Sequence, residues 1–216
     1  FCIGLFFLAF WQKEEQAFVF SWQRIKNIFS KPFWTVKISR WVLLFGLVLL
    51  ISAFFRFYRL VEVPPQMISD HAEKLLDVFD IMHGKTSVFF PRNTGREGFQ
   101  MYLTAAVILL FNSGFSFLSL KIGTTVLGFL TLPFIYLLGK ELGGKQAGLW
   151  AMAFGGIAYW HNVISRIALR FTLTPFFTAP AFYFLLRGMR RRSVNDFLIS
   201  GFFLGLGLHG YSTMRI

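Results

Sequence analysis

The chain has 216 residues, of which 55% are hydrophobic and only 15% are charged, and it contains 30 Phe. A soluble domain of this size could not enclose so many aromatic side chains and still cover its surface with polar groups. The apolar residues fall in long runs separated by basic clusters, which is typical of membrane spans. The composition therefore excludes an ordinary soluble domain and predicts an integral membrane protein.

The formal net charge is +12, and the sequence pI is near 10.3. In a soluble chain this excess would indicate nucleic acid, but here Lys and Arg flank apolar runs. We therefore expect anionic lipid headgroups, not nucleic acid, as partners. The single cysteine, Cys2, excludes an internal disulfide and a Cys-based metal cluster. His71 and His83 lack the spacing of a metal site, so no metal ligand and no cofactor are predicted, while divalent-metal dependence stays open.

The first part of the chain, residues 1–40, is expected to combine two short segments. Residues 1–11 are predicted to be the tail of an upstream helix, in a chain that lacks residues at both ends. Residues 12–40 scatter basic side chains among aromatic ones, which indicates a cytoplasmic interfacial segment. The first span is expected at about 41–57, short enough for Arg56 to extend to the membrane surface.

A long polar stretch, residues 58–116, follows this span and is predicted to be an external loop. Within it, apolar residues recur with helical spacing, at positions 72, 75, 76, 79 and 82. This pattern predicts a helix at about 70–83 that lies on the membrane surface. A second helix is expected at about 98–112, and its apolar part is too short to cross a bilayer, which favours a re-entrant or interfacial position.

The rest of the chain alternates apolar runs with polar or basic breaks. Spans are predicted at about 117–139, 147–163, 171–187 and 196–212. The last one contains Gly201-x-x-x-Gly205, a spacing that offers a close-packing face. The expected fold class is all-α: residues 41–216 would be the N-terminal part of a polytopic transmembrane helix bundle with a long external first loop.

The distribution of Lys and Arg sets the expected orientation. If the helix at 98–112 does not cross, the basic clusters at 12–40, 140–145 and 187–192 all lie on the cytoplasmic side, as the positive-inside rule requires. Several other Arg and Lys then fall on the outer side near apolar runs, where an unpaired cation is costly. An anion at membrane level, such as a lipid-linked phosphate, would account for them.

Two candidate sites lie in the external loop, and each has an ordinary alternative. Asp70 opens the surface helix, where Ser69 or Asp70 could simply be the N-cap. A carboxylate fixed at this point could also be a general base for an acceptor hydroxyl or amine. Arg96 and Glu97 belong to a polar, Gly-punctuated loop, which is either a surface turn or a site where Arg96 binds a phosphate and Glu97 a sugar or acceptor.

A third candidate group lies between two predicted spans on the outer side. Arg166 and Arg170 are four residues apart and therefore share one helical face. They either extend to the lipid surface or form a cationic clamp for a phosphate leaving group. His161 is near the same boundary and is either an interfacial hydrogen-bonded side chain or a substrate contact.

The order of these features resembles a known family. A basic flank and one span come first, followed by an Asp at the head of an outer helix. An Arg-Glu-Gly loop, a short apolar helix, a Gly-rich span and an Ile-Ser-Arg sequence then follow in this order. The stretch Gly95-Arg-Glu-Gly-Phe-Gln-Met-Tyr-Leu103 is similar to the (Arg/Lys)-(Glu/Pro)-Pro-Leu-x-x-Tyr-Leu loop of bacterial members, with Gly98 where relatives usually carry Pro. The chain resembles the N-terminal half of GT-C membrane glycosyltransferases of the protein-O-mannosyltransferase and aminoarabinose-transferase branch, glycosyltransferase family 39.

The resemblance implies a polyprenyl-phosphate sugar as donor and transfer with inversion on the outer face of a bacterial plasma (inner) membrane. Asp70 would match the family's essential acid, Arg96 a position near the donor phosphate, and Arg166 the Ser-Arg position of the second outer loop. The family's later spans help to bind the acceptor, so this part alone is expected to be inactive. Two alternatives remain: a non-catalytic, degenerate or truncated subunit of a larger membrane complex, and a lipid or ion transporter, for which the usual internal repeats are missing.

Overall fold

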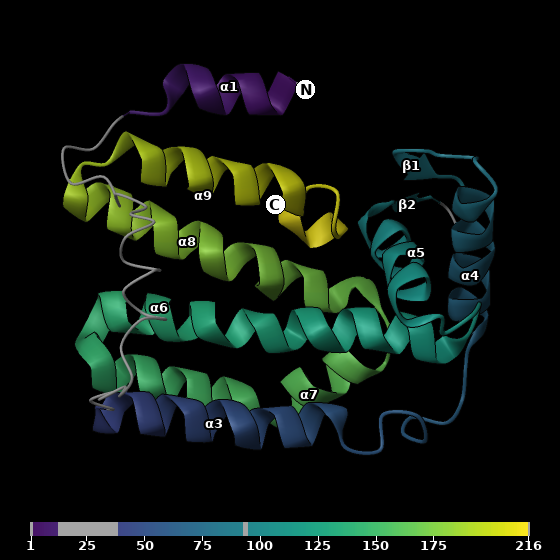
Figure 1. Ribbon diagram of the computed structural model, residues 1–216, viewed down its shortest axis with the longest axis horizontal. Helices are drawn as coiled ribbons and strands as arrows, with labels where there is room; N and C mark the ends of the chain where they lie inside the picture. Colours follow the sequence, from purple (N-terminus) through teal and green to yellow (C-terminus); the bar gives the residue numbers. More distant parts are fainter. Residues whose placement is uncertain (1, 13–38, 93–94, 216) are drawn as a thin grey trace, which may run out of the picture.

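The computed structural model describes residues 2–12, 39–92 and 95–215, which hold eight α-helices and one two-stranded sheet. The expected all-α class is confirmed for this part, whereas the predicted interfacial segment at 12–40 lies almost wholly outside the described residues. Five helices run side by side as a layered bundle (Figure 1): α1 (Cys2–Phe10), α3 (Arg40–Phe57), α6 (Phe117–Ile157), α8 (Leu173–Arg191) and α9 (Val194–Gly207).

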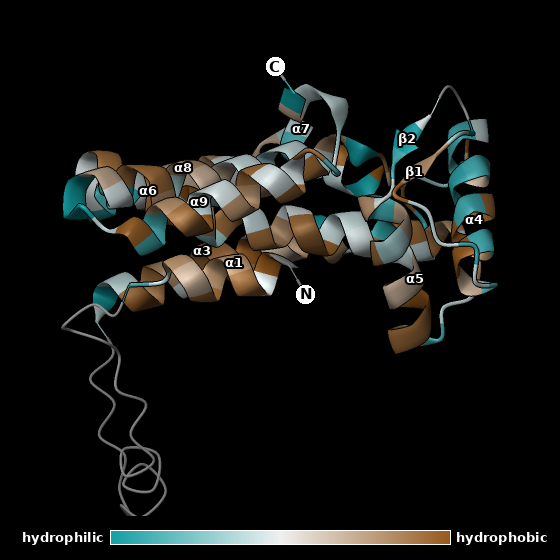
Figure 2. Ribbon diagram, turned by 90° about the horizontal axis from the view of Figure 1, so that it is seen from above, coloured by the Kyte–Doolittle hydropathy of each residue, from teal (hydrophilic) through white to brown (hydrophobic). Residues whose placement is uncertain are grey.

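Charged side chains are buried beside the apolar core, and many large apolar side chains are exposed. Among the largest fully buried side chains are four cations, Lys74, Arg96, Lys121 and Arg56, whereas large apolar side chains such as Leu50, 70% exposed, cover the outside. Figure 2 shows apolar residues along α1 and α3 and hydrophilic residues gathered at α4 and β2. Helices α3 and α6 are long and apolar enough to cross a membrane. An apolar exterior is unfavourable in water but suits lipid, so the protein is a membrane protein.

Helix α6 is a hairpin in which two predicted spans meet. Its helical geometry breaks at Gly143 and Gly144, and Gly144 has φ 81°, a conformation that favours glycine. Past this break the chain runs back beside the first arm (Figure 1), and a Cβ at Gly148 would lie 2.4 Å from the carbonyl oxygen of Tyr136. The second arm, expected at 147–163, ends at Ile157, and a separate helix α7 (Tyr159–Arg166) follows after Ala158.

Two helices of the predicted external loop lie across one end of the bundle (Figure 1): α4 (Ser69–Met82) and α5 (Phe99–Phe111). Between them, strands β1 (Phe89–Phe90) and β2 (Arg96–Glu97) pair antiparallel. The apolar faces of the two helices meet in a buried cluster of Val78, Phe90, Met101, Ala105 and Ile108. The N-cap of α4 is Ile68, not Ser69 or Asp70, because the side chain of His71 accepts the Ile68 N–H and fixes the helix start one residue earlier.

Two short 3-10 helices bring the distal part of the chain to this same end. They are η1 (Arg170–Thr172), immediately before α8, and η2 (Ser212–Arg215), after α9. A second buried cluster, formed by Leu127, Leu173 and Phe177, holds α6 against α8. Phe99 at the start of α5 packs edge-on against Phe177, with 4.9 Å between ring centroids. This packing places η1 and η2 next to the beginning of α5.

Candidate functional site

Asp70 is the start of a network of charged side chains at the α4/α5 end of the bundle. Its Oδ2 lies 2.6 Å from Nζ of Lys74, and its Oδ1 lies 3.3 Å from Nη2 of Arg96. The same Nη2 is 2.8 Å from Oε2 of Glu73. Lys74 is one helical turn beyond Asp70, so the two share a face of α4, while Arg96 approaches them from strand β2. Two cations therefore hold the Asp70 carboxylate from two sides.

Glu97 is the centre of a second group of ion pairs, which is joined to the first through strand β2. Its Oε2 is 2.5 Å from Nη1 of Arg170, and its Oε1 is 2.5 Å from Nη2 of Arg215. Consecutive residues of a strand point to opposite sides, so β2 directs Arg96 to α4 and Glu97 to η1 and η2. The seven residues Asp70, Glu73, Lys74, Arg96, Glu97, Arg170 and Arg215, called the ion network below, carry four positive and three negative charges.

The backbone carbonyl of Ala168 supports the network from the interior. It accepts hydrogen bonds from Nε2 of Gln100 at 2.8 Å and from Nζ of Lys74 at 3.4 Å. Ala168 is fully buried and has φ 58°, an uncommon conformation for a residue other than glycine. Such backbone outliers persist where surrounding contacts over-determine them, and they concentrate at functional sites.

Exposure divides the ion network into an outer and an inner part. The side chains of Arg96 and Lys74 are 0% and 1% exposed, whereas those of Asp70 and Arg215 are 27% and 54% exposed. Burial lowers the pKa of Lys74 to about 8, although its hydrogen bond to Asp70 acts in the opposite direction. Burial also lowers the pKa of Arg170, against the effect of Glu97. Arg215, Glu73 and Asp70 are therefore the members of the network that a molecule approaching from outside could reach.

His71 stabilises the start of α4 beside Asp70. Its Nδ1 accepts the backbone N–H of Ile68, and its Nε2 lies 2.7 Å from the carbonyl oxygen of Ile167. The two contacts together require the neutral ring, with Nδ1 as acceptor and Nε2–H as donor. Burial lowers the pKa of His71, which favours this neutral form.

Arg166 lies apart from the ion network and holds a different segment. Its guanidinium donates hydrogen bonds to four backbone carbonyls, that of Phe55 in the last turn of α3 and those of Tyr58, Arg59 and Val63 in the segment between α3 and α4. Lys121 supports the same segment by donating to the carbonyls of Leu60, Val61 and Pro64. These two cations fix the chain that leads to Asp70.

Of the residues singled out in the sequence, the structure brings together Asp70, Arg96, Glu97 and Arg170, and places Arg166 and His161 elsewhere. His161 lines a small cavity together with Arg56. Arg56 is 1% exposed and does not extend to the membrane surface as predicted. Glu73 and Lys74 were not among the predicted site residues, although their spacing of three and four residues from Asp70 places them on the same helical face.

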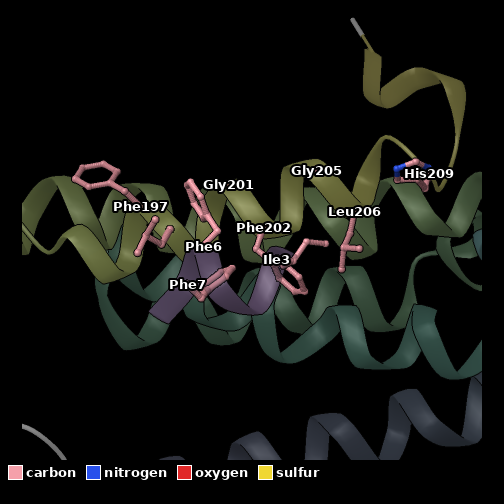
Figure 3. Close-up of a pocket in the computed structure, with 10 residues that line it drawn as sticks. Ile3, Phe6, Phe7, Phe197, Gly201, Phe202, Gly205, Leu206 and His209 are labelled. Carbon is pink, nitrogen blue, oxygen red and sulfur yellow. The ribbon is translucent and has the colours of Figure 1, made fainter. Parts of the chain in front are cut away.

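An apolar groove runs between α1 and α9 toward this end of the bundle (Figure 3). Its volume is about 730 Å³, and its wall consists largely of Ile3, Phe6, Phe7, Phe197, Phe202 and Leu206. Gly201 and Gly205 widen it, because a Cβ at either position would meet no atom within 4 Å. His209 lies at one end, and its backbone carbonyl accepts the N–H of Phe99, two residues after Glu97. The groove thus connects an apolar surface to the vicinity of the ion network.

Comparison with known protein families gives a match over the second half of the chain. Residues 99–216, more than half of the chain, match the family described as dolichyl-phosphate-mannose-protein mannosyltransferase. The chain belongs to this family. Neither the curated proteins nor the solved structures contain a significant match.

Membership of the mannosyltransferase family confirms the resemblance seen in the sequence and indicates a glycosyltransferase that uses a lipid-linked sugar. The matched segment contains Arg170 and Arg215, together with Arg166 and His161. Asp70 and strand β2 precede it. Glu97 of β2 pairs with Arg170 and Arg215 of this segment, and Lys74, the partner of Asp70, donates to the carbonyl of Ala168 within it. The structure thus attaches the candidate carboxylate to the family segment.

Proposed function

We propose that this member of the mannosyltransferase family carries part of the site for inverting transfer of a sugar from a polyprenyl-phosphate donor to an acceptor at the non-cytoplasmic membrane face. The observation that supports this most directly is the position of Asp70. Its carboxylate is partly exposed and is held by Lys74 and Arg96 in the same network as Arg170 and Arg215. General-base and phosphate-binding groups thus lie at one end of the bundle.

In the proposed reaction, Asp70 takes the proton of the acceptor hydroxyl or amine as the acceptor atom attacks the anomeric carbon. The bond between that carbon and the phosphate oxygen breaks, and the polyprenyl phosphate leaves with the electron pair. Arg215 and Arg170 would stabilise the negative charge that develops on the phosphate. The two arginines are already oriented by Glu97, so little reorganisation is needed when the phosphate arrives.

The buried cations have positioning roles in this proposal. Arg96 is fully buried and is occupied by Asp70 and Glu73, so it would orient the carboxylates without touching the phosphate. Arg166 would position Asp70 indirectly, because it holds the segment between α3 and α4 that leads to Asp70. Arg96 and Arg166 were expected to contact the substrate. In this proposal they instead position Asp70, which acts on the acceptor.

The groove between α1 and α9 supports a lipid-linked donor. Its apolar wall suits a prenyl chain. His209 lies at one end of the groove (Figure 3), and its carbonyl accepts the N–H of Phe99, two residues after Glu97 of the ion network. A donor lying in the groove would enter from the bilayer with its phosphate directed to the arginines. The outward orientation is part of the same proposal and is supported by the distribution of Lys and Arg along the sequence. A bacterial plasma membrane is also proposed, on the resemblance to bacterial members of the family.

The experiment compares Asp70→Asn with Asp80→Asn in the full-length protein, using radiolabelled polyprenyl-phosphate mannose and measuring sugar transfer. Asp80 is a matched control because it lies on the same helix and pairs with Arg92. Asp70→Asn is expected to reduce transfer by about 10²–10⁴-fold, the usual contribution of a general base. Asp80→Asn should keep near-normal transfer, and both variants should unfold at similar temperatures.

Unchanged transfer by Asp70→Asn would refute the proposed base. A wild-type protein that transfers no sugar from this donor would favour the alternative of a non-catalytic membrane subunit.

A further inference from the structure

Arg56, in the last turn of α3, is a buried cation without a carboxylate partner among the described residues. It is 1% exposed, and none of the salt bridges found in residues 2–12, 39–92 and 95–215 includes it. Its Nη1 donates to the carbonyl of Gly156 at 2.9 Å and to Oδ1 of Asn162 at 3.3 Å, and its Nη2 donates to the carbonyl of Gly155 at 3.2 Å. The neutral acceptors leave its positive charge uncompensated.

The Nε–H of Arg56 has no hydrogen-bond partner, although it is buried. A guanidinium has five N–H donors, and three hydrogen bonds therefore leave part of its capacity unused. A buried charge that is not paired is costly, and cations inside membrane proteins usually pair with an anion or face a polar cavity. The protein must therefore offset the charge of Arg56 by other means.

A closed-in cavity of about 90 Å³ lies directly against Arg56, between α3, α6, α7 and α8. Its polar lining consists of Arg56, His161, Thr131 and Thr172, and the remaining residues are apolar or glycine. Its lining, as far as residues 2–12, 39–92 and 95–215 form it, includes no acidic side chain. The volume is several times the minimum of about 10–15 Å³ that one water-sized particle needs. The cavity therefore combines a positive charge with space for a small ligand.

We propose that this cavity binds a small inorganic monovalent anion, of the size of chloride or bromide. Arg56 lines the cavity and would supply the positive charge that attracts the anion. The hydroxyls of Thr131 and Thr172 now donate to the carbonyls of Leu127 and Ile164, but each can rotate toward the cavity. None of the seven ion-network residues lines this cavity, so this site is separate from the proposed donor site.

The anion would stabilise the junction between α6 and α7. Arg56 connects the carbonyls of Gly155 and Gly156, at the end of α6, to Asn162 of α7. The same short helix α7 ends with Arg166, which holds the segment leading to Asp70. Anion binding would thus support the part of the scaffold that positions α4, and it does not depend on the proposed sugar transfer.

The experiment measures thermal unfolding of the protein in lipid nanodiscs, in potassium chloride, potassium bromide and potassium gluconate at equal ionic strength. Chloride and bromide are expected to raise the unfolding temperature in proportion to the logarithm of their concentration above Kd, by roughly 5–10 °C at a hundredfold excess over Kd. Arg56→Met should abolish this shift. Arg59→Met is the matched control and should keep the shift. Arg59 lies three residues after Arg56 in the sequence, but its side chain is 57% exposed and pairs with Glu62.

Two results would overturn the proposal. Superimposable unfolding curves of the wild type in chloride and gluconate would mean that the cavity holds only water, and an equal chloride shift in Arg56→Met would place the halide elsewhere. If Arg56→Met does not fold, bromide-soaked crystals of the wild type decide the question. An anomalous difference peak in the cavity supports the site, and its absence refutes it.

Discussion

The hairpin within α6 makes a sharp prediction about Gly148. A Cβ at this position would lie 2.4 Å from the carbonyl oxygen of Tyr136 and 2.9 Å from the backbone nitrogen of Lys140. Both atoms belong to the backbone of the first arm, so neither can rotate away as a side chain would. Gly148→Ala must therefore separate the two arms.

Two opposing contributions set the size of the effect. Replacing Gly by Ala inside a helix stabilises it by about 0.8–1.0 kcal/mol. Overpacking usually costs about 1–3 kcal/mol, and a clash with backbone atoms belongs at the upper end of that range. We expect Gly148→Ala to lose about 2 kcal/mol, which corresponds to roughly 4–8 °C in unfolding temperature for a chain of this size.

Gly46→Ala in α3 is the matched control for this substitution, because a Cβ there would meet no atom within 4 Å. This variant should show only the gain in helix propensity and unfold at the wild-type temperature or above. The assay is thermal unfolding in detergent or nanodiscs, with wild type, Gly148→Ala and Gly46→Ala measured side by side. Equal stabilities of the two variants would show that the arms of α6 do not pack as described.

Two pH-dependent predictions follow from the pKa values near the site, each measured as unfolding stability against pH. Because the pKa of His71 is lowered in the folded state, the unfolded state binds the proton first, and stability is lost as the pH falls below about 6.5. His71→Gln should remove this loss and His83→Gln, at the exposed helix end, should keep it; identical profiles would contradict the neutral His71. Because the pKa of Lys74 is lowered to about 8, stability should rise between about pH 8 and 10, by up to about 1.4 kcal/mol per pH unit. Lys74→Met should flatten that rise relative to Lys85→Met, which changes a 77% exposed side chain, and equal slopes would argue against a buried, charged Lys74.

The helices of the external loop illustrate how much local pattern reveals. The sequence predicted helices at about 70–83 and 98–112, and the structure has Ser69–Met82 and Phe99–Phe111. Apolar spacing along one face and flanking Gly residues are local features, so they can be read without knowledge of the fold. The N-cap differed, because the cap of α4 depends on the side chain of His71, which is in turn held by the carbonyl of Ile167, far along the chain.

The basic residues illustrate what local pattern does not reveal. Arg56 and Arg166 were both predicted to face lipid or a phosphate, since each flanks an apolar run. The structure instead provides backbone carbonyls for both, from the end of α6 for Arg56 and from the segment after α3 for Arg166. A sequence shows that a cation needs a partner, but it does not show which carbonyl groups the tertiary packing will place within reach.

The sequence by itself determined that this is a helical membrane protein related to lipid-dependent glycosyltransferases, because hydrophobic length, helical period and an ordered set of motifs are properties of consecutive residues. Only the tertiary structure decided which charges meet. Glu97 contacts Arg170 and Arg215, which are 73 and 118 residues further along the chain. Ion pairs form over a few ångströms in space, so contacts at such sequence separations depend on how the helices pack and not on any local pattern.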